Sequence, residues 1–370
     1  MKTQAIRHHS KCLRKGLRNP LTTVIAAIAL SLLASTSHAS KRPLFDEKAP
    51  LDAVLTVPLA QAYSQKKKDV RLYHNGTFSY KQASGGIKRL PVKVKTRGNF
   101  RRANCSMPPL RLNFAKKLVK GSLLNGQDKL KLVGPCQFGG IFKSLIGLEY
   151  LAYQVFETVS DYSLKTRLLN LSYVDSDKKR KPRTSAAFVI EDIEDLAKRH
   201  KLRFHSPEKI PRNRMNLEHT ALVEVFAYFI GNNDYSTLTG LPGTDCCHNV
   251  RLLANKDSTG KFIPVPYDFD MSGLVNAPYA APPPHLPINE VRKRYFNGWC
   301  KDDKHFRDAV EKFKQHKPEI MALVDDSTLI NTAMKKKTKT YFEKFYSMAD
   351  TPKRYQKEII GRCRGKTTTS

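Results

Sequence analysis

The sequence is short of acidic residues and lacks several motifs that mark common enzyme classes. It has 33 Asp and Glu against 65 Lys and Arg, which gives a formal net charge of +32. It contains no Ser nucleophile elbow, no H-E-x-x-H helix and no Walker-type phosphate loop. These absences argue against α/β-hydrolase, zincin and P-loop chemistry. No internal repeat and no nucleic-acid-binding motif is visible either.

The excess of positive charge favours anionic partners. These include acidic or phosphorylated proteins, anionic polysaccharide, a membrane surface and nucleic acid. The basic residues form short clusters, such as Lys66–Lys68, Lys178–Arg183 and Lys335–Lys337, rather than a stripe interleaved with exposed aromatic residues. We therefore expect no specific nucleic-acid partner. A solvated basic surface without a partner is the alternative.

The longest apolar run near the N-terminus predicts a signal peptide. A basic region precedes the run Leu21–Ala34, and Ser37-His38-Ala39 follows with small residues that suit signal peptidase. We expect cleavage near Ala39 and export to the periplasm or the extracellular space, with an uncleaved N-terminal anchor as the alternative. No later stretch is long and apolar enough for a membrane helix, so no transmembrane span is expected after cleavage.

Cysteine usage agrees with export. Cys12 lies in the expected signal segment, and an even number of cysteines remains. These are Cys105, Cys136, Cys246, Cys247, Cys300 and Cys363. In an oxidising compartment they predict disulfide bonds, although the sequence does not fix the pairing. Zinc is the alternative, but no C-x-x-C pair exists, and two adjacent cysteines suit tetrahedral ligation poorly.

The order of the predicted elements gives a β-rich first half and a helix-rich second half. Leu51–Leu59 alternates as a strand does, Asn75-Gly76 predicts a hairpin turn, and Ile141–Thr158 and Leu217–Ile230 have helical periodicity. We expect an α+β chain of two lobes with a cleft between them. The expected parts are a signal peptide (1–39), a β-rich lobe (40–140), a hinge and helix-rich lobe (141–350) and a basic tail (351–370).

The stretch Phe226–Gly273 concentrates acidic and amide side chains at the ends of apolar segments. Asp234 follows an aromatic helix, Asn249 precedes one predicted strand and Asp268 ends the next. Oxygen ligands of this kind suit hard cations, and a carboxylate can also accept the proton of an attacking hydroxyl group. Each residue alone could cap a helix or form a turn. Together they predict a phosphoryl-transfer centre.

The motifs in this stretch and upstream of it resemble those of the CotH family of secreted, atypical protein kinases. They occur in order between about Val92 and Gly273, which is about half of the chain. They are Thr96-Arg97-Gly98-Asn99, Pro109–Phe114, Gly231-Asn232-Asn233-Asp234, His248-Asn249 and Tyr267-Asp268-Phe269-Asp270. The resemblance implies a two-lobed, kinase-like fold. It also implies that the protein binds ATP with Mg²⁺ or Mn²⁺ and phosphorylates serine or threonine on exported proteins.

The resemblance also assigns roles to the acidic residues. Carried over by position, Asp234 is the catalytic base, while Asp268, Asn249 and Asp270 hold the metal ion. His248 could act as a base by its chemistry. At a strand start after two cysteines, however, a structural role is the more common one.

The nucleotide phosphates would be bound by cations of the first half. Arg97, Arg111 and Lys131 are the candidates, because a guanidinium group binds phosphate oxygens in a bidentate manner. The competing lysines are Lys95 and Lys129. Glu149 would orient such a cation, with Glu191 as its rival. The chain departs from ordinary kinases because it has no G-x-G-x-x-G loop.

Two other functions are compatible with the same features. A catalytically inactive, kinase-like envelope protein would bind anionic polymer through its basic surface. A metal-dependent phosphohydrolase would release phosphate from ATP without an acceptor. Stabilisation by metal and ATP that Asp268→Ala abolishes would separate a catalyst from a polymer binder, whose binding depends only on salt.

Overall fold

The computed structural model describes residues 43–368, which fall within one compact unit, 40–370. The expected signal peptide, 1–39, lies outside the described residues. Between residues 43 and 368, no helix combines the length and the apolar character that a membrane crossing requires.

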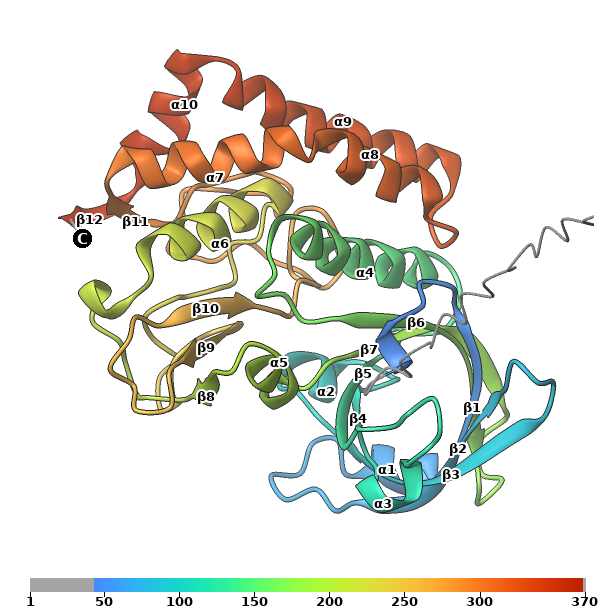
Figure 1. Cartoon of the computed structure of the whole chain (residues 1–370). Helices are drawn as coiled ribbons and strands as arrows, with labels where there is room; N and C mark the ends of the chain where they lie inside the picture. Colours follow the sequence, from blue (N-terminus) through green and yellow to red (C-terminus); the bar gives the residue numbers. More distant parts are fainter. Residues whose placement is uncertain (1–42, 369–370) are drawn as a thin grey trace, which may run out of the picture. The chain divides into compact units, whose positions relative to one another are not determined.

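Seven strands form a closed barrel, which occupies the lower part of Figure 1. They are β1 (Leu51–Val57), β2 (His74–Lys81), β3 (Ile87–Thr96), β4 (Leu110–Asn113), β5 (Lys129–Val133), β6 (Thr166–Asp175) and β7 (Arg183–Ile190). The order around the barrel is β1-β2-β3-β4-β5-β7-β6. Parallel pairing of β1 with β6 closes the ring, with Leu51 opposite Leu169, whereas every other neighbouring pair is antiparallel.

Alternating side chains of the strands fill the barrel. In β1, Leu51, Ala53, Leu55 and Val57 are buried, whereas Asp52 between them is exposed. The inward side chains of the other strands join the same apolar cluster, which the short helices α1 (Leu59–Ser64) and α3 (Lys116–Val119) extend. Burying each large aliphatic side chain contributes roughly 1.5–3 kcal/mol, so the alternating pattern accounts for much of the stability of the barrel.

Helices dominate the rest of the chain. They are α2 (Phe100–Asn104), α4 (Phe142–Val159), α5 (Ile193–Arg199), α6 (Leu217–Ile230), α7 (Asp303–Gln315), α8 (Lys317–Asp326), α9 (Thr332–Ala349) and α10 (Pro352–Glu358). Figure 1 shows α7, α8 and α9 above α6 and α4, and α4 packs against β6 and β7 of the barrel. Helix α6 is buried almost all round because α7, α9 and a small sheet contact it.

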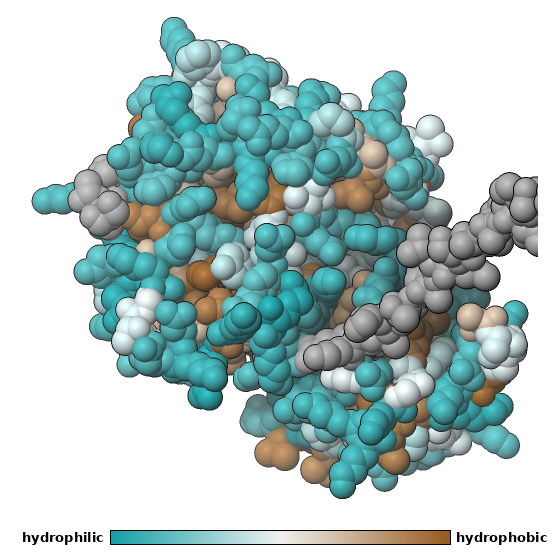
Figure 2. Space-filling view, in the orientation of Figure 1, coloured by the Kyte–Doolittle hydropathy of each residue, from teal (hydrophilic) through white to brown (hydrophobic). Residues whose placement is uncertain are grey.

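Two small sheets complete the fold. One is antiparallel, in the order β10-β9-β8, and the other pairs β11 with β12 in parallel. The strands are β8 (Arg203–His205), β9 (Val250–Ala254), β10 (Ile263–Pro266), β11 (Trp299–Lys301) and β12 (Arg364–Thr368). Figure 2 shows a mainly hydrophilic surface with smaller groups of hydrophobic side chains, as expected of a strongly charged chain.

The prediction of disulfide bonds is confirmed. The pairs are Cys105–Cys136, Cys246–Cys247 and Cys300–Cys363, and they include every cysteine of the described residues. Each cysteine of this part of the chain therefore has another cysteine as its partner. The pair Cys300–Cys363 joins the end of the chain to β11, beside the pairing of β11 with β12.

The prediction of a two-lobed, kinase-like fold with a β-rich N-terminal lobe and a helical C-terminal lobe is wrong. The structure is a closed seven-stranded barrel combined with ten α-helices in the described range. The barrel also takes β6 and β7, which follow α4 in the chain. Local alternation predicts that a segment is a strand, but it does not say which distant strand pairs with it. The closure of β1 on β6 was therefore not visible in the sequence.

Candidate functional site

Asp234 lies in the loop that follows α6, and its side chain is held from two sides. Helix α6 ends at Ile230, and Gly231, which caps it, has a φ of 65°. The Asn232 side chain then accepts a hydrogen bond from Asp234 N (3.0 Å). The Oδ1 atom of Asp234 lies 2.6 Å from His248 Nε2, and Oδ2 accepts a hydrogen bond from Asn249 Nδ2 (2.9 Å). Both carboxylate oxygens therefore have a fixed orientation.

His248 forms an acid–base pair with Asp234. Burial alone would lower the pKa of His248, but the hydrogen bond to Asp234 and the charges of Asp234 and Asp268 outweigh this effect and raise it. The contact with Asp234 therefore favours the protonated form of His248. From its place in the sequence, His248 was expected to be structural rather than a base. The feature of the sequence that could have indicated its contact with Asp234 is its position next to Asn249, a predicted site residue.

Strand pairing brings Asn249 and Asp268 to one edge of the small sheet. Val250 at the start of β9 lies opposite Pro266 at the end of β10, and Tyr267 N donates a hydrogen bond to Asn249 O (3.0 Å). Asp268 N donates a hydrogen bond to the Tyr153 hydroxyl group on α4 (2.9 Å).

Asn249 and Asp268 also share an unusual backbone conformation. Their φ angles are 51° and 65°, in the left-handed region. This region costs most residues roughly 1 kcal/mol or more, and Asn and Asp tolerate it best. The local backbone therefore favours these two residue types at these two positions.

Asp270 faces a buried arginine. The Nε atom of Arg101, on α2, lies 3.8 Å from Asp270 Oδ2, and its Nη1 atom lies 3.3 Å from Glu149 Oε2. The Tyr279 hydroxyl group donates a hydrogen bond to Asp270 Oδ2 (3.1 Å). Burial raises the pKa of both carboxyl groups, and Arg101 only partly offsets this shift.

Arg101 was not among the predicted site residues. Its signal was its place in the run Arg97–Arg102, directly after the motif that contains Arg97. Glu149 was expected to orient a phosphate-binding cation, and it contacts Arg101 rather than Arg97 or Lys131.

Arg97 and Lys131 supply positive charge from the barrel side. Burial lowers the pKa of Arg97, and the charge of Asp268 opposes this shift. Burial together with the charges of Arg97 and Arg251 lowers the pKa of Lys131 to about 7, again against the effect of Asp268. The Lys131 ammonium group lies 4.0 Å from the centre of the Tyr267 ring. Both cations are therefore close enough to Asp268 to interact with it.

The other basic candidates lie on neighbouring strand positions. Arg111 pairs with Lys131 across β4 and β5, and with Lys95 across β3 and β4. It has no ion pair or hydrogen bond to an acidic side chain in the described residues. Lys95 lies over the Tyr73 ring, and Lys129 is exposed to solvent. Of the basic residues considered from the sequence, Arg97 and Lys131 are thus the two whose pKa values respond to the charge of Asp268.

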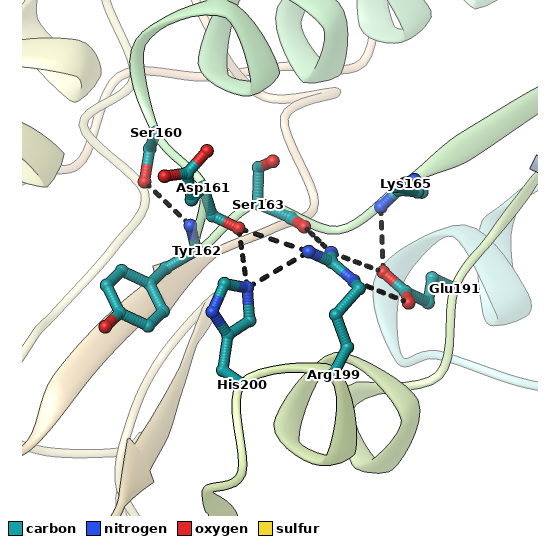
Figure 3. Close-up of polar contacts among 8 residues, drawn as sticks. All are labelled: Ser160, Asp161, Tyr162, Ser163, Lys165, Glu191, Arg199 and His200. Carbon is teal, nitrogen blue, oxygen red and sulfur yellow. Dashed lines mark hydrogen bonds and ion pairs between the residues drawn. The ribbon is translucent and has the colours of Figure 1, made fainter. Parts of the chain in front are cut away.

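Glu191 belongs to a separate structural network (Figure 3). Its Oε2 atom lies 3.0 Å from Arg199 Nη2 and accepts a hydrogen bond from Lys165 N (3.1 Å). Arg199 in turn donates a hydrogen bond to Ser163 O (2.8 Å). These contacts fasten α5 to the loop after α4. Glu191 therefore supports the fold, and none of these contacts involves a cation of the candidate site.

The side-chain oxygen atoms of Asp268 and Asn249 at the sheet edge could supply part of the ligand set of a hard metal ion. The Asp268 carboxylate accepts no hydrogen bond within the described residues, and Asn249 donates through Nδ2, which leaves Oδ1 as an acceptor. However, no group of three or more His, Cys, Asp or Glu side chains between residues 43 and 368 is arranged to hold a metal. Mg²⁺ binds few protein oxygens and takes further ligands from water and substrate phosphate, so this sparse set suits it.

Several buried polar atoms around the site have no hydrogen-bond partner. They are Arg97 Nε, Arg101 Nε, Glu149 Oε1 and Asn233 Oδ1. An unsatisfied buried polar group is costly, and a water molecule, an ion or a ligand can satisfy it. Such atoms also occur elsewhere in the fold, for example in Gln127, Trp299 and Tyr346, so these four do not by themselves mark a binding site.

No family model matches the chain, and no curated protein and no solved structure is significantly similar to it.

Proposed function

We propose that the protein transfers the γ-phosphoryl group of ATP to a serine or threonine hydroxyl group of an exported protein, in a metal-dependent reaction. One observation supports this proposal most. Asp234 and Asp268 come from separate loops, yet the charge of each acts on both His248 and Asp270. Asp268 also acts on Arg97 and Lys131. Phosphoryl transfer needs such a combination of carboxylates and cations in one place.

The Asp234–His248 pair provides the base for the reaction. The acceptor hydroxyl oxygen forms a bond to the γ-phosphorus, the bond from this phosphorus to the bridging oxygen of ADP breaks, and the hydroxyl proton passes to the pair. The contacts with His248 and Asn249 keep the Asp234 carboxylate in one orientation before the acceptor arrives. This pre-organisation lowers the entropic cost of proton transfer.

Asp268 and Asn249 are the residues that would hold Mg²⁺ or Mn²⁺. When bound, such an ion neutralises negative charge on the phosphate oxygens. Arg97 does the same from the barrel side as a positive charge, and Lys131 does so in its protonated form. Asp270 acts indirectly. It forms an ion pair with Arg101 and accepts a hydrogen bond from Tyr279, so we propose that it positions the loop that carries Asp268.

Export is the second part of the proposal. The expected signal peptide and the three cysteine pairs both suit an oxidising compartment outside the cytoplasm. The substrate would then be a protein of the periplasm or the extracellular space.

The test uses the oxidised chain from Ser40 to Ser370, which is one compact unit. It is incubated with γ-labelled ATP, Mg²⁺ or Mn²⁺, and a serine-rich acidic protein as acceptor. We expect label in the acceptor, and we expect Asp234→Asn to reduce the rate at least about a hundredfold. The matched control is Asp257→Asn, the same change at an exposed residue in the turn between β9 and β10. It should leave the rate unchanged.

Two results would overturn the proposal. One is transfer that Asp234→Asn leaves intact. The other is release of inorganic phosphate with no labelled protein, which would favour the phosphohydrolase.

A further inference from the structure

A cleft of about 1180 Å³ lies outside the candidate site. Its walls come from α4, α9, the end of α10 and the segments 274–276 and 289–294. None of Asp234, His248 and Asp268 lines it. We call it the basic cleft.

Cationic side chains are in large excess along the basic cleft. Arg292, Lys293, Arg294, Lys336, Lys337, Lys344, Arg354 and Arg362 line it, against two acidic residues, Glu290 and Glu358. Glu358 is already engaged, because it lies 3.0 Å from Arg354 Nε and accepts a hydrogen bond from the Tyr228 hydroxyl group. The basic cleft therefore has little negative charge of its own to balance its cations.

The lysines of the basic cleft differ from lysines that lie close by in the fold. Lys339 of α9 lies 2.5 Å from Asp325, and Lys317 of α8 lies 2.8 Å from Glu343. By contrast, the ammonium groups in the basic cleft have no ion pair or hydrogen bond to any residue between 43 and 368. They belong to Lys293, Lys336, Lys337 and Lys344, all of which are exposed. Like charges gathered without counter-ions repel one another, and an anionic ligand relieves that repulsion.

The floor of the basic cleft is apolar and held in place. Leu145, Leu148, Leu274 and Val275 are buried there, and Met334 lies beside them. Tyr341 lies among the cations, 3.7 Å from Arg294 and 4.8 Å from Arg292, measured to the ring centre. Arg294 is fixed by hydrogen bonds to Phe229 O and Tyr341 O (2.8 and 2.7 Å).

Shape and chemistry together select one class of occupant. A planar lipid surface does not enter a concave cleft, and nucleobases bind best to exposed aromatic faces, whereas Tyr341 is buried. Aliphatic side chains on the floor and unpaired lysines on the rim suit an extended peptide that carries both aliphatic and acidic residues.

We propose that the basic cleft binds an acidic segment of polypeptide. The cleft wall is continuous with the candidate site: Gly273 N donates a hydrogen bond to Gly231 O (2.9 Å), and Leu274 N donates to Ile230 O (2.8 Å). The loop that carries Asp234 and the loop that carries Asp268 are therefore joined to each other by backbone hydrogen bonds next to the cleft wall. We assign the bound segment to the protein substrate, a step that depends on the proposed function, whereas the binding itself does not.

The experiment measures binding without nucleotide. A fluorescent peptide of about 12 residues that alternates Glu with Leu is titrated with the oxidised chain, and fluorescence anisotropy is followed at about 0.15 M salt. A second peptide has Gln in place of every Glu. The test variant is Lys336→Gln/Lys337→Gln/Lys344→Gln. The matched control is Lys117→Gln/Lys120→Gln/Lys179→Gln, which removes the same charge from exposed, unpaired lysines on the barrel side.

We expect the acidic peptide to bind and the Gln peptide to bind at least about tenfold more weakly. The cleft variant should lose about tenfold or more in affinity, and the control variant less than about twofold. Equal losses in the two triple variants would overturn the proposal, because they would show a general effect of net charge. Equal binding of the two peptides would also overturn it. The proposal would also be overturned if an anionic vesicle or a single-stranded oligonucleotide bound more tightly than the peptide, displaced it and depended on the same lysines.

A further variant separates this proposal from the proposed function. Asp268→Asn should bind the acidic peptide as the unaltered chain does. Peptide binding without any phosphoryl transfer would support the proposal for the basic cleft and overturn the proposed kinase function. Phosphoryl transfer without peptide binding that depends on the cleft lysines would support the kinase function and overturn the proposal for the cleft. The folded state of each variant is checked by its thermal melting curve.

Discussion

The barrel and the helical part of the molecule contribute to the candidate site in different ways. The barrel contributes positive charge from regular positions: Lys131 is part of β5, and Arg97 follows β3 directly. The helical part contributes carboxylate and amide groups from loops, and Asn249 and Asp268 adopt left-handed backbone conformations there. Strand register tolerates many side chains, whereas a left-handed loop position tolerates few. The acidic side of the site should therefore be the more sensitive to substitution.

The largest expected effect is on the acidic side. We expect Asp268→Asn to reduce phosphoryl transfer by about a hundredfold or more, because it removes the charge while keeping a residue that accepts a positive φ. The thermal melting temperature should stay nearly unchanged, which separates a lost charge from a lost fold. A rate within tenfold of the original would place Asp268 outside the reaction and weaken the contrast between the two sides.

The next effect separates two arginines of the barrel side. We expect Arg97→Met to reduce kcat/KM by about ten- to a hundredfold, because Arg97 interacts with Asp268. Arg111→Met should reduce it by less than about threefold, because Arg111, on β4 between β3 and β5, has no ion pair or hydrogen bond to an acidic side chain in the described residues. Steady-state kinetics with ATP as the varied substrate measures both. Equal losses would mean that the whole strand face, rather than Arg97, binds the nucleotide.

A smaller effect concerns pH. The pKa of Lys131 is about 7 in the free protein, and bound phosphate favours its protonated form, so binding raises this pKa. Nucleotide binding then takes up a proton above pH 7, and affinity falls as the pH rises through that value. We expect a loss of up to about tenfold between pH 6 and pH 8.5, measured by calorimetric titration. Lys131→Met should remove this part of the dependence, and Lys129→Met, at an exposed neighbour, should keep it.

The smallest effect on activity is expected at Glu191. Glu191→Gln breaks the ion pair with Arg199 but leaves hydrogen bonds possible, so the free energy of unfolding should fall by about 1–3 kcal/mol. Urea denaturation measures this loss. The transfer rate of the folded variant should stay the same. A lower rate at full stability would show that the network in Figure 3 reaches the candidate site.

Part of the site was predictable because its residues flank regular elements. Leu217–Ile230 was predicted as a helix, and α6 has the same bounds. Asn249 and Asp268 were placed at the start of one strand and the end of the next, and antiparallel pairing brings such positions together. The convergence of the acidic side thus follows from local patterns.

The rest could not be predicted because it depends on tertiary burial. Arg101 belongs to the site through Glu149 and Asp270, which lie far from it in the sequence. A basic residue on a short helix gives no sign of such partners. Closure of the barrel was hidden for the same reason, since it depends on pairing between β1 and β6.

That pairing has a consequence for how the chain folds. β1 comes early in the chain, but one of its edges has no partner until Thr166–Asp175 has also reached the compartment where the chain folds. An unpaired strand edge is a template for aggregation, so the unfolded chain should need a chaperone during this interval.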